Sequence, residues 1–205
     1  MIWFDHIAIA GETLEEAQEY VENALGVRLQ PGGTHDVFFT HNAVLGLSDG
    51  LYLEAIASNP EAPKPARPRW FDLDRFSGAP RLTNWICRTD NMETTLALGL
   101  AGWGAPVALQ RGALKWRMAV PDNGVLPFDN CAPALIQWDT STHPADMLEK
   151  SGVRLTRLIV HHPQADTLKV MIEPLMLDDR VVFETGPSQL QAQFETPHGA
   201  RMIAP

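Results

Sequence analysis

The stretch IWFDHIAIAGETLEE, residues 2–16, opens the chain and decides the fold class. Its first nine residues combine β-branched and aromatic side chains with a loose alternation, which predicts a strand over 2–10. Thr13 and Glu16 have the spacing of a capping box, which predicts that a helix begins here. Gly26 is a typical residue just past the end of such a helix. The chain therefore begins with a strand followed by a helix.

Short strands separated by turns are predicted after this helix. The dipeptide Asp49-Gly50 is a strong hairpin signal, and the glycines of 31–33 indicate another turn. One unit of strand, helix and three strands cannot cover both faces of its own sheet, so we expect a partner unit. The candidate strands of the first unit are 27–29, 36–39, 43–47 and 51–57.

The same order of elements returns twice. The second unit has a strand at 82–88 and then a helix whose cap is predicted at Asp90 with Glu93 and whose apolar residues are Leu96, Leu98 and Leu100. Its remaining strands are predicted at 107–110, 114–120 and 134–139. The third and shortest unit has a strand at 155–161, a helix from 165 to about 173, and strands at 180–184, 189–195 and 200–203.

These repeats predict an α+β fold in which βαβββ modules form a curved mixed sheet or cup. We expect one domain over 1–205, with modules at 1–57, 82–140 and 153–205. Residues 58–80 are rich in proline, which predicts a linker or an irregular wrap around the first module.

Composition excludes several classes of partner. The 205 residues carry 16 Lys and Arg against 25 Asp and Glu, a net charge of −9, with no basic run for phosphate backbones or anionic lipid. We therefore expect no nucleic acid and no membrane partner. The start of the chain has no signal-peptide pattern and no stretch of about 18 apolar residues occurs, so we expect a cytoplasmic protein. Cys87 and Cys131 lie outside any CxxC spacing, which predicts two buried reduced thiols.

Five short segments together resemble the glyoxalase-like branch of the vicinal oxygen chelate superfamily. That superfamily also includes the glyoxalases, the bleomycin-resistance proteins and the extradiol dioxygenases. The resemblance covers about residues 2–175 and rests on DHIAIA (5–10) before a capped helix, GGTH (32–35), THNAVL (40–45), GLYLE (50–54), and ALIQW (134–138) followed by His143-Pro144.

The resemblance implies paired modules whose curved sheets enclose a cup, with metal ligands on the first and last strands of two modules. His6 and Glu54 occupy those positions in the first module, and their nitrogen and oxygen donors suit a divalent zinc, iron, nickel or manganese ion. The second module departs from the pattern, because Trp85 stands at its first-strand position and Gln137 at its last. An indole cannot bind a metal and an amide oxygen binds weakly, so the metal site is half formed.

Each candidate residue of the cup has a functional and a structural interpretation. His41 could serve as a general acid or base and Asn42 as a neutral donor and acceptor, or they are a partly exposed histidine and a turn cap. His6 is a cup residue or a strand histidine paired with Asp5. Glu54 lies in an apolar strand and must be paired, exposed or functional.

Gln137 and Trp138 would add an amide and an aromatic wall to the substrate-binding set. The sequence therefore predicts a glyoxalase-like protein that binds a small molecule with a carbonyl or carboxylate between modules, with no organic cofactor and no assigned reaction. One alternative is a lyase, isomerase or dioxygenase that depends on a divalent metal. The other is a metal-free binding or assembly protein, in which modules pair across a homodimer.

Overall fold

Strand β1 (Ile2–Ala10) lies in the middle of an eight-stranded sheet in the computed structural model, which describes residues 1–98, 102–176 and 178–205. The strand order is β2-β3-β4-β1-β5-β8-β7-β6. β1 runs parallel to β4 and antiparallel to β5, so it joins the two halves of the sheet. Every residue of β1 except Trp3 is buried, which explains why the polar Asp5 and His6 need partners.

The first module follows its predicted outline. Helix α1 (Leu14–Leu25) begins with the Thr13–Glu16 capping box and ends at Gly26, whose left-handed backbone suits glycine. The antiparallel strands β3 (Thr40–Gly46) and β4 (Tyr52–Ser58) are joined by Asp49-Gly50, and both turn residues have positive φ. These predictions are confirmed, because each depends on signals local to the chain.

The predictions for the segment before β3 are wrong. Residues 27–29 and 36–39 are not strands, and β2 spans Gln30–His35, which includes the glycines expected to turn. A Cβ on Gly32 would overlap the side-chain oxygen of Asn42 on β3. The glycines therefore allow β2 to approach β3 closely.

The second module pairs with the first across β1 and β5. It comprises β5 (Arg81–Thr89), α2 (Met92–Ala97), β6 (Ala105–Arg111), β7 (Leu114–Val120) and β8 (Ala134–Trp138).

The end of α2 and its cap differ from the prediction. Asn91 rather than Asp90 caps α2, because its side chain accepts a hydrogen bond from the backbone N–H of Thr94. The helix residue Leu100 predicted from the sequence lies outside the described residues.

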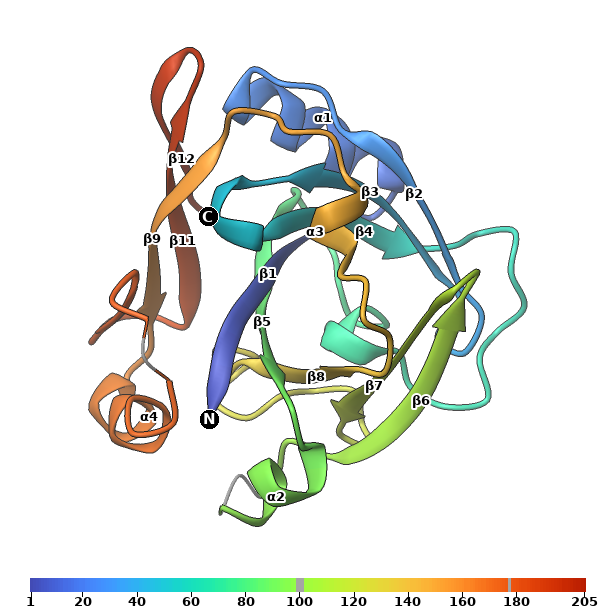
Figure 1. Cartoon of the computed structure of the whole chain (residues 1–205), viewed down its shortest axis with the longest axis vertical. Coiled ribbons are helices and arrows are strands. Elements are labelled where there is room, and N and C mark those ends of the chain that lie inside the picture. Colours follow the sequence, from blue (N-terminus) through green and yellow to red (C-terminus); the bar gives the residue numbers. More distant parts are fainter. Residues whose placement is uncertain (99–101, 177) are drawn as a thin grey trace.

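The eight-stranded sheet curls strongly into a half-barrel (Figure 1). Its two end strands, β2 and β6, contact each other, so the inner face of the sheet forms a cup. The predicted α+β fold with a curved mixed sheet is confirmed.

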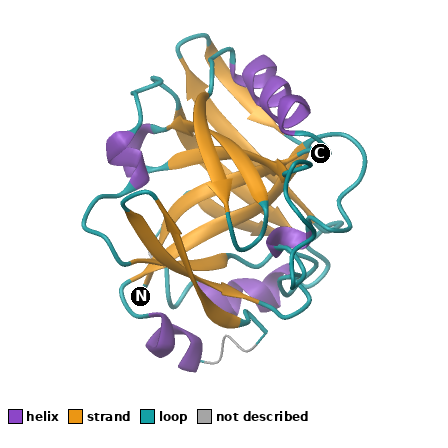
Figure 2. Ribbon diagram, turned by 90° about the vertical axis from the view of Figure 1, so that its right-hand side faces the viewer, coloured by secondary structure: helices purple, strands orange, loops and turns teal. Residues whose placement is uncertain are grey.

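The third module forms its own four-stranded sheet, in the order β10-β9-β11-β12. It lies beside the half-barrel (Figure 1), and its strand β11 contacts β5. Figure 2 shows from the side that strands make up most of the molecule. Thus the first and second modules share the cup, and the third supports it from outside. Its elements are β9 (Arg154–His161), α4 (Ala165–Ile172), β10 (Val181–Glu184), β11 (Gln189–Thr196) and β12 (Gly199–Ile203).

The proline-rich segment 58–80 wraps the first module and contributes to its core. Trp70 and Phe71 are buried in a 3₁₀ turn, and the Trp70 ring stacks on Phe38 with centroids 4.4 Å apart. Trp70 and Phe71 also reach the cup. The segment therefore supplies part of the wall of the cup.

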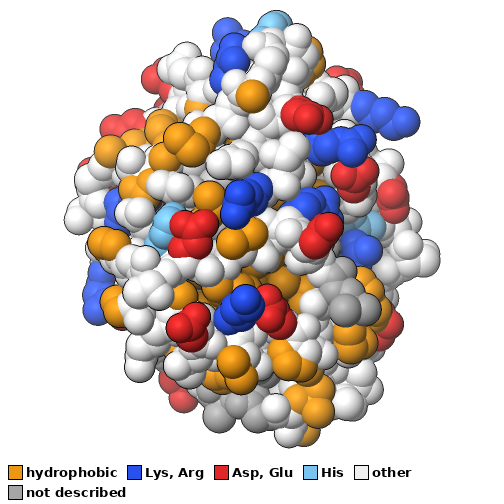
Figure 3. All heavy atoms as spheres, turned by 90° about the vertical axis from the view of Figure 1, so that its left-hand side faces the viewer, with side chains coloured by type: hydrophobic (Ala, Val, Ile, Leu, Met, Phe, Trp, Pro, Cys, Tyr) orange, Lys and Arg blue, Asp and Glu red, His pale blue; other side chains and the backbone are white. Residues whose placement is uncertain are grey.

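The face formed by the third module carries acidic and basic side chains close to one another (Figure 3). Ion pairs such as Arg157–Glu184 and Lys169–Glu173 lie on these elements. In the described part of the chain no helix is long and apolar enough to cross a membrane. Cys87 and Cys131 are free and buried, as predicted.

Candidate functional site

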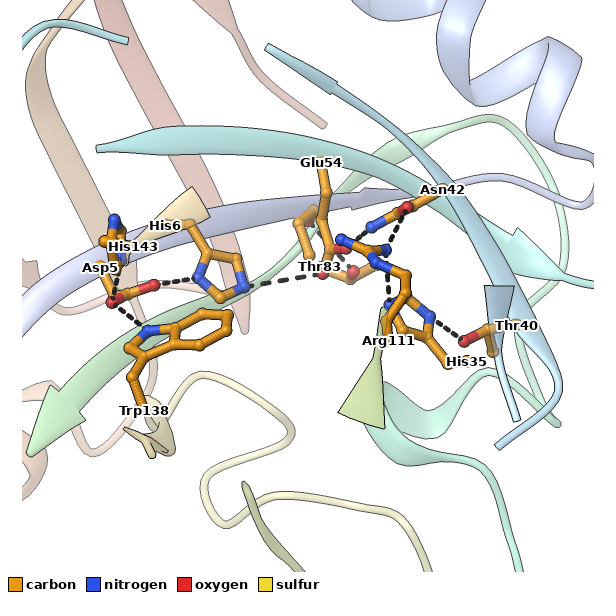
Figure 4. A network of polar contacts seen from close by, with 11 residues as sticks. Asp5, His6, His35, Thr40, Asn42, Glu54, Thr83, Arg111, Trp138 and His143 are labelled. Atoms are coloured by element: carbon orange, nitrogen blue, oxygen red, sulfur yellow. Dashed lines mark hydrogen bonds and ion pairs between the residues drawn. The ribbon is translucent and has the colours of Figure 1, made fainter. Parts of the chain in front are cut away.

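A β-bulge in β1 places two neighbouring residues in one network. The pairing with β5 shifts between Phe4 and His6, so Asp5 is an extra residue with no direct partner on β5. Neighbouring strand residues normally point to opposite faces, and a bulge changes that direction. As a result the Asp5 carboxylate lies 2.6 Å from Nδ1 of His6 (Figure 4).

The Asp5 carboxylate is buried and accepts hydrogen bonds from three rings on three elements. Besides His6, the indole Nε1 of Trp138 donates at 3.1 Å and Nε2 of His143 at 2.9 Å. His143 uses its Nδ1 to accept from the backbone N–H of Ala145, so its Nε2 carries the proton. Asp5 therefore ties β1 to β8 and to helix α3 (Pro144–Met147).

His6 lies between two carboxylates. Its Nε2 is 3.7 Å from Oε1 of Glu54, and its ring stacks on Tyr52 with centroids 4.2 Å apart. Burial alone lowers the pKa of His6, but the hydrogen bonds and charges of Asp5 and Glu54 outweigh it and raise the pKa to about 9. His6 is therefore an imidazolium at neutral pH.

The pKa values of the two carboxyl groups, Asp5 and Glu54, are lowered. Burial raises the pKa of Asp5, yet the hydrogen bonds from His143 and His6 bring it below its usual range. Burial also raises the pKa of Glu54, but the hydrogen bond and charge of His6, together with the hydrogen bond from Asn42, lower it overall. Asp5, His6 and Glu54 thus form a buried chain of alternating charges.

Asn42 connects Glu54 to Arg111. Its Nδ2 donates to Oε2 of Glu54 at 2.6 Å, and its Oδ1 accepts from Nη1 of Arg111 at 3.1 Å. The backbone N–H of Gly33 donates to the same Oδ1 at 3.0 Å. Arg111 reaches this point from the end of β6, so it bridges the two ends of the curled sheet.

His35 lies on the other side of Arg111 and is neutral. Burial lowers the pKa of His35 to about 4. Its Nε2 is 3.4 Å from the guanidinium of Arg111 and its Nδ1 is 2.8 Å from the Thr40 hydroxyl. An arginine can only donate, so Nε2 is the acceptor and Nδ1 carries the proton. The guanidinium of Arg111 therefore meets uncharged partners.

The polar network lines an inner cavity that adjoins a larger groove. The inner cavity has a volume of about 30 Å³ and is lined by His6, His35, Asn42, Tyr52, Glu54, Trp70, Phe71, Arg111, Trp116, Met118, Ile136 and Trp138. The outer groove measures about 850 Å³ and shares Tyr52 and Arg111 with it. Those two side chains form the boundary between cavity and groove.

Two predicted cup residues lie elsewhere. Gln137 is next to Trp138 on β8 and points to the opposite face, where its Oε1 accepts from the backbone N–H of Met92 at 2.8 Å. His41 alternates with Asn42 in the same way and lies toward the acidic side chains of Glu15 and Glu61. The prediction that these two residues line the cup is wrong.

The remaining candidates His6, Asn42, Glu54 and Trp138 lie together in the cavity, and their roles stay predictions.

Arg111 was not identified from the sequence, although the alternation of side chains along β6 places it on the face toward the cup. Val107, Leu109 and Arg111 share one face of that strand, so a cation follows two apolar residues toward the cup. The predicted strand ended at residue 110, one position too early. His35 was not assigned to the cup either, because its approach depends on the close packing of β2 against β3.

The donor set does not fit the divalent metal that the resemblance implies. On the last strand of the second module, the residue beside the expected ligand Gln137 that faces the cavity is the apolar Ile136, whereas Trp85 lies in the core and donates to the Cys131 carbonyl. Of the four expected ligand positions, only those of His6 and Glu54 present donor atoms to the cavity. Among the described residues, no three His, Cys, Asp or Glu side chains group as metal ligands do.

Comparisons with known proteins find similar solved structures and one matching family. A solved structure of a hypothetical protein from Staphylococcus aureus has a TM-score of 0.61 at 15% identity, covering 92% of this chain and 88% of that one. Methylmalonyl-CoA epimerase from Mycobacterium tuberculosis gives a TM-score of 0.43 at 19% identity, covering 68% and 88%. No curated protein shows a significant sequence match. The family model for a glyoxalase-like domain matches residues 4–176, so the chain belongs to the glyoxalase-like domain family, as its sequence pattern predicted.

Proposed function

We propose that this chain binds a small oxygenated molecule whose carboxylate, or a similar anionic oxygen group, pairs with Arg111. One observation carries this proposal: the Arg111 guanidinium borders both the cavity and the groove. In the described part of the chain, no carboxylate lies within ion-pair distance of it. A partly buried cation with only neutral partners is a good site for a planar anion, which it can bind with two parallel hydrogen bonds.

The two volumes support a ligand that lies mainly in the outer groove. About 30 Å³ is room for roughly one water-sized group. A ligand can therefore place one oxygen atom beside His6 and Glu54, while its body stays in the outer groove. The groove of about 850 Å³ has the size typical of small-molecule sites.

The pKa shifts favour binding over proton transfer. A catalytic acid or base works best when its pKa is near the working pH. The pKa of His6 is raised to about 9 and the pKa of Glu54 is lowered, so neither exchanges a proton readily near neutrality. Together they provide a fixed, nearly neutral pair of charges against which a ligand oxygen can be oriented.

Thermal-shift and calorimetric titration with acetate, pyruvate and hexanoate test the proposal, with methyl acetate as the uncharged probe. We expect the carboxylates to raise the melting temperature, because a ligand that binds only the folded state stabilises it. Arg111→Gln should abolish this shift. Arg117→Gln is the matched control, since Arg117 pairs with Glu93 and Asp139. If wild type and Arg111→Gln bind carboxylates equally, the proposal is wrong.

A further inference from the structure

The outer groove beyond Arg111 is mostly apolar. It runs between the β6–β7 turn, β2 and the segment that contains α3. Its apolar walls come from side chains on four separate parts of the chain: Pro31, Val44, Leu114, Pro144, Met147 and Leu148. Met147 is 63% exposed, and a flexible thioether at the rim can adapt to ligands of different shape.

The groove carries a charged side chain near its inner end. Arg111 is the one charged side chain among the described residues that line it. The hydroxyl-bearing segment 140–142 supplies neutral polar groups on one side. A ligand with several phosphates would need several cations, whereas a single guanidinium matches a single carboxylate.

We infer that the ligand is an amphipathic monocarboxylic acid, with its carboxylate on Arg111 and an aliphatic or aromatic body along the groove. This inference rests on the proposed function and adds the chemical class of the ligand. A cation at the inner end and apolar walls along the rest specify both ends of such a molecule. The boundary position of Arg111 also fixes its direction, with the carboxylate inward and the chain toward Met147.

Chain length gives the sharpest test. Each methylene that leaves water for an apolar groove should tighten binding about fourfold, until the chain reaches the end of the groove. The probes are the straight-chain carboxylates from acetate to decanoate, each below its micelle concentration, with octan-1-ol as the uncharged probe of matched length. Calorimetry at constant pH and salt measures the dissociation constants.

Two variants assign the effect to the groove. Met147→Asn should weaken octanoate binding several-fold and leave acetate binding unchanged. Leu114→Ala, on the opposite wall, is the second variant and should act in the same direction. Val170→Asn is the matched control, because Val170 is 73% exposed on α4 and lies outside the groove.

The outcomes separate this inference from the proposed function. A rise in affinity with chain length that needs both Arg111 and Met147 supports both. Arg111-dependent binding of acetate with no gain on lengthening the chain overturns the amphipathic ligand and leaves the proposed function intact. Equal binding of octanoate and octan-1-ol, or of octanoate by wild type and Arg111→Gln, overturns both.

Discussion

Asp5 and His6 are neighbours on one β-strand, yet their side chains meet at 2.6 Å. A regular strand would separate them on opposite faces of the sheet, and the bulge at Asp5 brings them to the same one. Because Trp138 and His143 also donate to Asp5, this irregularity connects the two modules through one carboxylate. The candidate site therefore depends on a local irregularity in the central strand.

Asp5→Asn should destabilise the protein strongly. The substitution leaves the His6 imidazolium buried with less compensating charge, and breaking a buried pair costs about 3–5 kcal/mol. Urea unfolding measures this loss, and NMR titration should show the pKa of His6 falling below about 9. Asp49→Asn is the control, because its ion pairs with Arg154 and Arg180 are on the surface and contribute about 0–1 kcal/mol. Similar losses for both variants would contradict the assignment.

Stability should decline in alkaline solution because of His6. Its pKa is about 9 in the folded state against an ordinary 6.5, so the folded state binds more protons between these values. The free energy of unfolding therefore falls as pH rises from about 6.5 through 9, and the contribution is complete below 6.5. Melting curves across this range should lose that decline in His6→Gln. Parallel curves for wild type and variant would count against a buried imidazolium.

His35 should titrate in the opposite sense. Burial holds its pKa at about 4, so the unfolded state binds the proton first as pH falls from about 6.5. The contribution of His35 to stability is therefore complete above 6.5 and is lost as pH falls through 4. Nitrogen NMR shifts should report a neutral ring with a bare Nε2 at about pH 6. A midpoint near 6.5 would show that His35 is more exposed than this structure has it.

Gly32→Ala tests the close approach of β2 to β3. The new Cβ would overlap Oδ1 of Asn42, so the amide that connects Glu54 to Arg111 must move. We expect a loss of about 1–3 kcal/mol and weaker carboxylate binding. At Gly186 a Cβ would meet its nearest atom at an ordinary 3.4 Å, so Gly186→Ala is the control and should change stability little. Wild-type stability and binding in Gly32→Ala would refute this role.

Gln137→Ala should affect the helix and spare the cup. Its Oε1 accepts a hydrogen bond from the backbone N–H of Met92 in the first turn of α2, a contact like an N-cap. Losing such a bond costs about 0.5–2 kcal/mol. Calorimetric titration should give unchanged carboxylate binding. A clear loss of binding would show that Gln137 lines the cup, and would contradict its position on the opposite face of β8.

The confirmed sequence predictions rest on local signals. The capping box of Thr13 and Glu16 and the left-handed turn at Asp49-Gly50 are each specified within a few residues. The strand predictions at 27–29 and 36–39 were wrong because they were placed on either side of a turn expected at 31–33. Glycine favours turns locally, whereas in β2 it is required by a neighbouring strand. That requirement comes from Asn42, a residue of the following strand.

The residues of the candidate site were likewise predicted only in part. His6 and Glu54 were identified from the family resemblance, and Glu54 also because a carboxylate in an apolar strand must be paired, exposed or functional. Gln137 and Trp138 could not both face the cup, since strand residues alternate, and Arg111 was missed because the predicted strand ended before it. The pairing of Asp5 with His6 was one of two open interpretations of His6.

By itself, the sequence determined the repeated modules, because periodicity, capping and turn chemistry act over short distances. Its resemblance to a known family determined the family assignment and pointed to His6 and Glu54 as residues of the cup. Only the tertiary structure decided which modules share the cup, that the bulge turns Asp5 toward His6, and that Arg111 meets Asn42 across the curled sheet. Those outcomes depend on strand order and register between distant segments, and no local pattern specifies them.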